Sequence, residues 1–139
     1  MEGSYLSVKV IEARNLRPVG EEHSADPYVK LAIEGQTKET VFQEGTLDPK
    51  WNQTFKFEIR SGKDDLEVLV LDRDLYASDD FIGRVMIPLE TLKDQMKMDT
   101  WYDLESTNPA EKWQGEIRIE TQWIHSRVRF FSSLIKKLD

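Results

Sequence analysis

The 139-residue chain contains no cysteine and only two histidines. The absence of cysteine excludes disulfides and thiolate metal sites, and it suits a reducing compartment. No apolar run approaches the roughly 18 residues that a membrane-spanning helix needs. The first residues, Met1-Glu2-Gly3-Ser4, show no secretory signal. The length favours one domain, and these absences together predict a cytoplasmic location.

Basic residues are also in the minority. The chain has 19 Lys and Arg against 26 Asp and Glu, which gives a net charge of −7. A nucleic-acid binder normally carries a basic face, so this class is disfavoured. A glycine-rich phosphate loop is missing, and His23 and His125 stand outside the hydrolase and zinc-protease motifs. We therefore expect a binding module and not an enzyme.

The apolar residues that are present follow a period of two. Leu6, Val8 and Val10 alternate with Ser7 and Lys9, and the same alternation recurs along the chain. This pattern is typical of antiparallel strands with one buried face. We predict strands over 4–14, 28–34, 36–42, 51–60, 65–71, 83–87, 100–104 and 115–123, and a short helical turn over 89–98. The predicted fold is all-β, an eight-stranded antiparallel β-sandwich.

The last sixteen residues differ from the rest. Apolar residues at spacings of three and four predict an amphipathic α-helix: Ile124, Val128, Phe131, Ile135 and Leu138. This tail carries +3, whereas the preceding 123 residues carry −10. We predict a domain over 1–123 and a basic helical tail over 124–139. The apolar stripe needs a surface, which can be the sandwich itself, a protein partner, a second copy of the chain or a membrane; protein packing is favoured.

Carboxylates gather in two predicted loops. Residues 18–26 and 72–80 together hold seven acidic side chains. Clustered carboxylates repel one another, and a hard cation with oxygen ligands relieves that repulsion. An Asp-rich loop can equally be an ordinary solvated turn. An EF-hand starting at Asp72 fails, because Tyr76, Ala77 and Gly83 stand where a ligand, a glycine and a glutamate are needed.

Four segments resemble the C2 domain family. They are VKVIEARNL at 8–16, ADPYVKL at 25–31, TLDPKWNQTFKFEI at 46–59 and LVLDRDLYASDDFIG at 69–83. The resemblance extends over about residues 4–123 and implies a sandwich with three loops at one end. Its strand order is similar to the second of the two circularly permuted C2 topologies. For many members it also implies calcium-dependent docking to anionic phospholipid, in membrane trafficking or signalling.

The resemblance implies a set of Ca²⁺ ligands in this chain: Asp26, Asp72, Asp74, Asp80 and Glu21. The family's ligand six residues before Asp26 is replaced by Gly20, and Glu21 beside it is the substitute. The alternative is a calcium-silent C2 domain that acts as a protein–protein interaction module. A strong phosphoinositide groove is not expected, because Lys38 is retained but Thr40 replaces the second lysine of that pattern.

Apolar residues stand at the tips of the two acidic loops. They are Val19 in the first loop and Leu75 and Tyr76 in the second. Such residues either fold back onto the domain or insert into the lipid interface, where tyrosine is a natural residue. Insertion is our prediction. The protein would then be peripheral to anionic membranes when calcium rises, because bound calcium cancels the charge that otherwise repels the leaflet.

Overall fold

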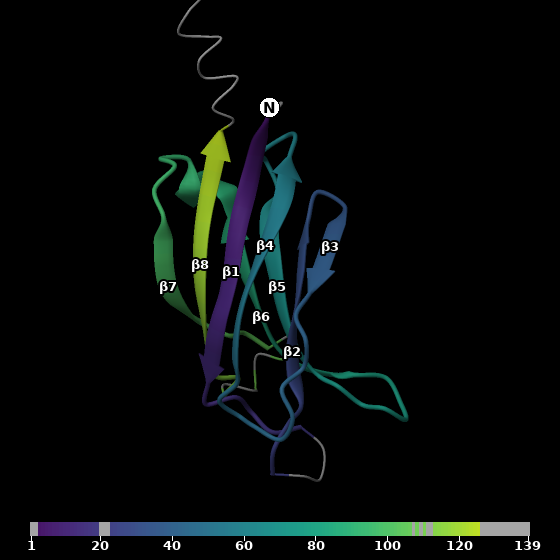
Figure 1. The fold of residues 1–139 in the computed structure, drawn as a ribbon. Helices are drawn as coiled ribbons and strands as arrows, with labels where there is room; N and C mark the ends of the chain where they lie inside the picture. Colours follow the sequence, from purple (N-terminus) through teal and green to yellow (C-terminus); the bar gives the residue numbers. More distant parts are fainter. Residues whose placement is uncertain (1–2, 20–22, 107, 109, 111–112, 126–139) are drawn as a thin grey trace, which may run out of the picture.

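The structure is a computed structural model that describes residues 3–19, 23–106, 108, 110 and 113–125. It is an all-β sandwich of eight strands and one short 3₁₀ helix (Figure 1). The elements are β1 (Ser4–Arg14), β2 (Pro27–Ile33), β3 (Gln36–Glu39), β4 (Lys50–Ile59), β5 (Asp65–Asp72), β6 (Asp80–Pro88), η1 (Leu89–Leu92), β7 (Met98–Asp103) and β8 (Glu116–His125).

Each layer of the sandwich is a four-stranded antiparallel sheet. One sheet has the order β4-β1-β8-β7 and the other the order β3-β2-β5-β6. Strand β1 lies between β4 and β8, so Tyr5 is opposite both Glu58 and Ile124. These long-range pairings bring segments more than a hundred residues apart into one ladder, which closes the sheet around β1.

The core lies between the two sheets and comes from the alternating apolar positions. In strands, side chains at every second residue share one face. The side chains with no exposed surface include Leu6, Val8, Val10, Val29, Leu31, Phe57, Ile59, Leu66, Val68, Val70, Ile82, Ile117 and Ile119. The period of two is therefore the physical origin of the core.

Glycine is required at two places in this framework. The β2–β3 hairpin turns through Glu34 and Gly35 with φ values of 48° and 78°, the left-handed pair that a two-residue hairpin favours. On β6, a Cβ at Gly83 would approach the Cβ of Leu104 to 2.7 Å. A larger residue at Gly83 would therefore push away the segment that follows β7.

The predicted sandwich is confirmed, and its boundaries shift in three places. β6 begins at Asp80, three residues before the predicted start, because Asp80 pairs with Asp72. The predicted helical turn is shorter, Leu89–Leu92. β8 continues through Ile124 and His125, which the sequence pattern assigned to the tail. The remainder of the predicted tail helix, 126–139, lies outside the described residues.

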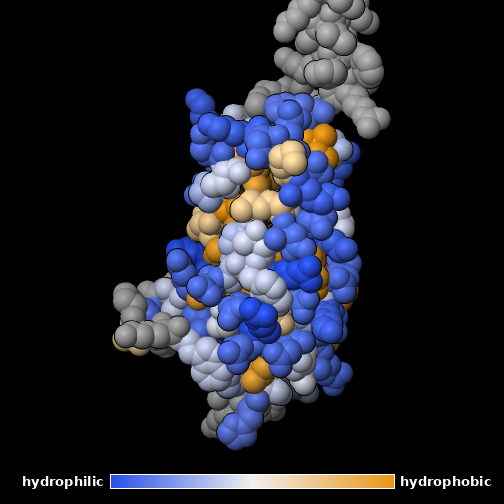
Figure 2. Space-filling model, turned by 90° about the vertical axis from the view of Figure 1, so that its left-hand side faces the viewer, coloured by the Kyte–Doolittle hydropathy of each residue, from blue (hydrophilic) through white to orange (hydrophobic). Residues whose placement is uncertain are grey.

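Three connections meet at one end of the sandwich: the β1–β2 loop (15–26), the β3–β4 loop (40–49) and the β5–β6 loop (73–79) (Figure 1). We call this the loop end. The β5–β6 loop projects sideways from the sandwich, beyond the edge formed by β2 and β3. Figure 2 shows the side that carries β7, where polar side chains predominate and apolar ones form small separate groups. The loops are therefore the part of the molecule to examine for function.

Candidate functional site

The ends of three neighbouring strands position three of the predicted ligands. Asp26 immediately precedes β2, Asp72 ends β5 and Asp80 begins β6. In the sheet order β2-β5-β6, Asp72 is opposite Pro27 on one side and Asp80 on the other. The ladder therefore brings together carboxylates that are far apart in the sequence.

A cavity of about 330 Å³ opens between the β1–β2 and β5–β6 loops. Its lining includes the four described carboxylates of the predicted ligand set, Asp26, Asp72, Asp74 and Asp80. The three predicted insertion residues, Val19, Leu75 and Tyr76, line the same cavity. Glu21, the fifth predicted ligand, lies outside the described residues.

Backbone hydrogen bonds hold Asp26 and Asp72 against each other. The Asp26 N–H donates to Oδ1 of Asp72 at 2.8 Å, and the Arg73 N–H donates to the Asp26 carbonyl at 3.0 Å. The Gly45 N–H, from the β3–β4 loop, donates to Oδ1 of Asp26 at 2.7 Å. One oxygen of each carboxylate thus fixes the loops, and no hydrogen bond from the described residues engages the other.

The charge of Asp72 is unfavourable in this setting. Burial raises the pKa of its carboxyl, and repulsion from Asp26, Asp80 and Asp74 adds to that rise against the single hydrogen bond from the Asp26 N–H. Like charges and desolvation both disfavour the ionised form. The cavity therefore stores electrostatic repulsion that a cation would relieve.

Asp74 shapes the tip of the β5–β6 loop. Its Oδ1 accepts hydrogen bonds from the N–H groups of Tyr76 at 2.8 Å and Ala77 at 3.2 Å. This turn presents Leu75 and Tyr76 outward, with 73% and 97% of their surfaces exposed. Val19 differs from them, because it is half-buried and packs against the core.

A tyrosine–aspartate contact that sequence reasoning missed fastens this loop. The hydroxyl of Tyr28 on β2 donates to Oδ2 of Asp79, whose Oδ1 accepts the N–H of Asp74 at 2.9 Å. Burial and this bond raise the pKa of Tyr28 to about 12. The N–H of Asp74 and the Tyr28 hydroxyl lower the pKa of Asp79. Both acids are visible in the sequence, but their partner, 51 residues from Asp79, is not signalled by any spacing.

The donor set of the cavity suits calcium. Carboxylate oxygens are the hard ligands that Ca²⁺ takes, whereas zinc prefers histidine or cysteine. Asp26, Asp72, Asp74 and Asp80 are the described residues that would hold the ion. Within the described part of the chain, no three acidic, histidine or cysteine side chains are already gathered closely enough to share one. Mutual repulsion opposes such gathering in the metal-free protein.

No helix among the described residues is long and apolar enough to cross a membrane.

Comparison with known proteins gives a consistent result. Residues 4–104 match the family model described as C2 domain. The chain is 30% identical over 125 residues to Ras GTPase-activating protein 4B of Homo sapiens, covering 89% of this chain and 16% of that protein. It is 38% identical over 110 residues to a C2 and GRAM domain-containing protein of Arabidopsis thaliana, covering 77% and 10%. The chain therefore spans about a sixth or less of these relatives.

Two solved structures illustrate the likeness in fold. The first C2 domain of plant extended synaptotagmin 1 superposes with a TM-score of 0.77 at 25% identity, covering 88% of this chain and 95% of that one. A calcium-bound pair of C2 domains from extended synaptotagmin 2 gives a TM-score of 0.74 at 25% identity, covering 88% and 46%.

Proposed function

Because the chain belongs to the C2 domain family, we propose that it is a calcium-dependent module that docks onto anionic phospholipid membranes through its loop end. One observation carries the proposal: four carboxylates and two strongly exposed apolar side chains line the same cavity. In this proposal the chain binds and positions, and it catalyses no reaction.

The carboxylates make docking conditional on a cation. Without one, the negative charge around Asp72 repels an anionic leaflet. Calcium, when bound, supplies the positive charge that offsets these carboxylates and coordinates lipid phosphate oxygens. Asp26 and Asp72 are already fixed by backbone donors, so the sandwich itself need not rearrange. The switch is chiefly electrostatic.

The loop tip supplies the apolar part of the attachment. Leu75 contributes aliphatic surface, and Tyr76 combines an aromatic ring with a polar hydroxyl, a combination that favours the membrane interface. Because Asp74 holds the backbone of the tip, little order has to be gained on insertion. Val19 packs against the core, so the proposal assigns insertion chiefly to Leu75 and Tyr76. The protein is then peripheral to membranes.

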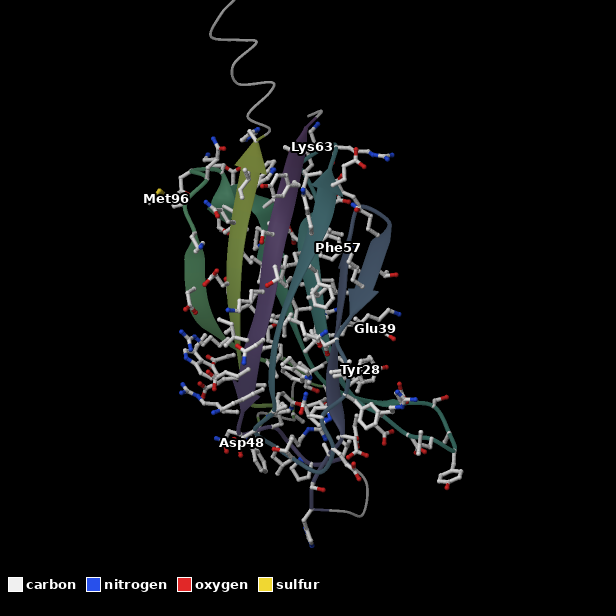
Figure 3. All side chains as sticks on the ribbon, in the orientation of Figure 1. Tyr28, Glu39, Asp48, Phe57, Lys63 and Met96 are labelled. Carbon is white, nitrogen blue, oxygen red and sulfur yellow. The ribbon has the colours of Figure 1, made fainter. Side chains whose placement is uncertain are left out.

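Vesicle co-sedimentation tests this function. We expect phosphatidylserine vesicles to bind the chain in calcium and to release it in chelator. The double variant Leu75→Ala/Tyr76→Ala should bind at least about tenfold more weakly, with an unchanged calcium affinity in solution. Met96→Ala is the matched control: Met96 is 66% exposed and lies at the opposite end of the sandwich (Figure 3). Equal binding in calcium and in chelator would contradict the proposal and favour a calcium-silent interaction module.

A further inference from the structure

A second cavity, of about 510 Å³, borders the β5–β6 loop. Arg73, Asp74 and Leu75 line both cavities, so this loop forms a shared wall between them. The second cavity is completed by Tyr28 of β2 and by the segment from Glu39 to Phe42. It therefore lies on the flank that carries β3, where Figure 3 shows Tyr28 and Glu39.

The walls of this flank cavity are unusually apolar for an exposed surface. Val41 is 59% exposed, Phe42 37% and Leu75 73%, and all three line the cavity. Exposed apolar side chains that gather in one place mark interaction sites. The sandwich does not cover these side chains, although they stand next to its core.

A cation is held over this apolar surface. The Arg73 guanidinium carbon lies 4.6 Å from the centre of the Phe42 ring, a cation–π arrangement. Among the described residues, no carboxylate lies within ion-pair distance of the guanidinium, because Asp79 accepts from Tyr28 and Asp74 instead. An arginine in this state can donate to the two oxygens of a phosphate.

We infer that Val41, Phe42 and Arg73 form a second membrane-contact surface, which meets lipid together with the Leu75–Tyr76 tip. This inference rests on the proposed function. Leu75 belongs to both surfaces, so a bilayer that covers Leu75 brings its headgroups and upper acyl chains to Val41 and Phe42. Arg73 then contacts a lipid phosphate without a bridging metal. Glu39, Asp74 and Asp79 also border the cavity, and they disfavour a multiply phosphorylated headgroup.

The inference fixes the orientation of the docked domain. The β3 flank tilts toward the membrane, and the side that carries β7 faces water. A protein partner on the same surface would compete with the membrane for Leu75, so the two occupants are distinguishable by experiment.

Fluorescence quenching by lipid tests the orientation directly. Phe42→Trp and the matched control Met96→Trp are bound to phosphatidylserine vesicles in calcium, with brominated acyl chains as quencher and the wild-type chain as the background of native tryptophans. We expect additional quenching for Phe42→Trp and none for Met96→Trp. Additional quenching in neither variant while the chain remains bound to the vesicles would overturn this inference and leave the proposed function standing.

Affinity gives a second readout. Val41→Ser/Phe42→Ser should weaken calcium-dependent vesicle binding by about tenfold, and Arg73→Gln by roughly threefold. The calcium affinity in solution should stay unchanged in both. Unchanged vesicle affinity in both variants would overturn the inference. If the wild-type chain binds no vesicles in calcium, the proposed function fails and this inference fails with it.

Discussion

The two ends of the sandwich use the same chemical group in opposite ways. At the end away from the functional loops, Glu34 accepts the N–H groups of Arg60 at 2.8 Å and Gly62 at 3.0 Å, and the Ser61 hydroxyl at 3.2 Å. Burial alone would raise the pKa of Glu34, but these donors outweigh it and lower the pKa. At the loop end, burial and three neighbouring carboxylates raise the pKa of Asp72.

This difference separates a structural acid from a functional one. Glu34 stabilises the fold when it is ionised, because backbone donors satisfy its charge. Asp72 destabilises the metal-free fold when it is ionised, because it has one backbone donor and several like charges around it. Perturbed acids of the second kind concentrate at functional sites. The loop end therefore carries an electrostatic cost that binding can recover.

The largest expected effect comes from the body between the two ends. Phe57 has no exposed surface, so Phe57→Ala removes a buried ring and leaves a cavity. We expect the free energy of unfolding to fall by about 3–5 kcal/mol, measured by urea denaturation. Phe42→Ala is the control, because Phe42 is exposed at the loop end, and its loss should be below about 1 kcal/mol. Equal losses would contradict the assignment of the core.

Glu34→Asn should produce the next largest effect. Asparagine tolerates the left-handed backbone at this position, so the change isolates the loss of the longer carboxylate. We expect a loss of about 1–2 kcal/mol at neutral pH. A group with a lowered folded pKa stabilises above its unfolded pKa, so the difference from wild type should vanish below about pH 4. A difference that is constant from about pH 7 to about pH 3 would show that the charge of Glu34 is not responsible.

The smallest effect is predicted for Tyr28→Phe, which removes the hydroxyl that fastens Asp79. We expect a loss of about 1 kcal/mol or less in global stability, and faster hydrogen exchange of the Asp74 amide, measured by NMR. Asp79→Ala should accelerate that exchange further, because the Asp74 N–H donates directly to Asp79. Unchanged exchange in both variants would show that this contact does not hold the loop.

The body could be predicted from sequence because period-two alternation reports burial directly. The start of β6 was missed because Asp80 and Phe81 do not continue the alternation, and only pairing with β5 makes them strand. The resemblance identified four of the cavity carboxylates, since ligand spacing within a loop is local. The contact of Tyr28 with Asp79 and the packing of Val19 depend on how loops fold back in three dimensions, which no local pattern encodes.

Ionised Asp72 should be a burden on the metal-free fold and an asset once calcium binds. Thermal unfolding of the wild-type chain and of Asp72→Asn, each in chelator and in millimolar calcium at neutral pH, tests this central claim directly. In chelator the variant should melt at the higher temperature, because Asn keeps the acceptor for the Asp26 N–H and removes the repulsion. In calcium the order should reverse, because only the wild type gains about 2 kcal/mol from binding. Wild-type melting curves that coincide in calcium and chelator, with the variant the less stable in both, would contradict this role of Asp72.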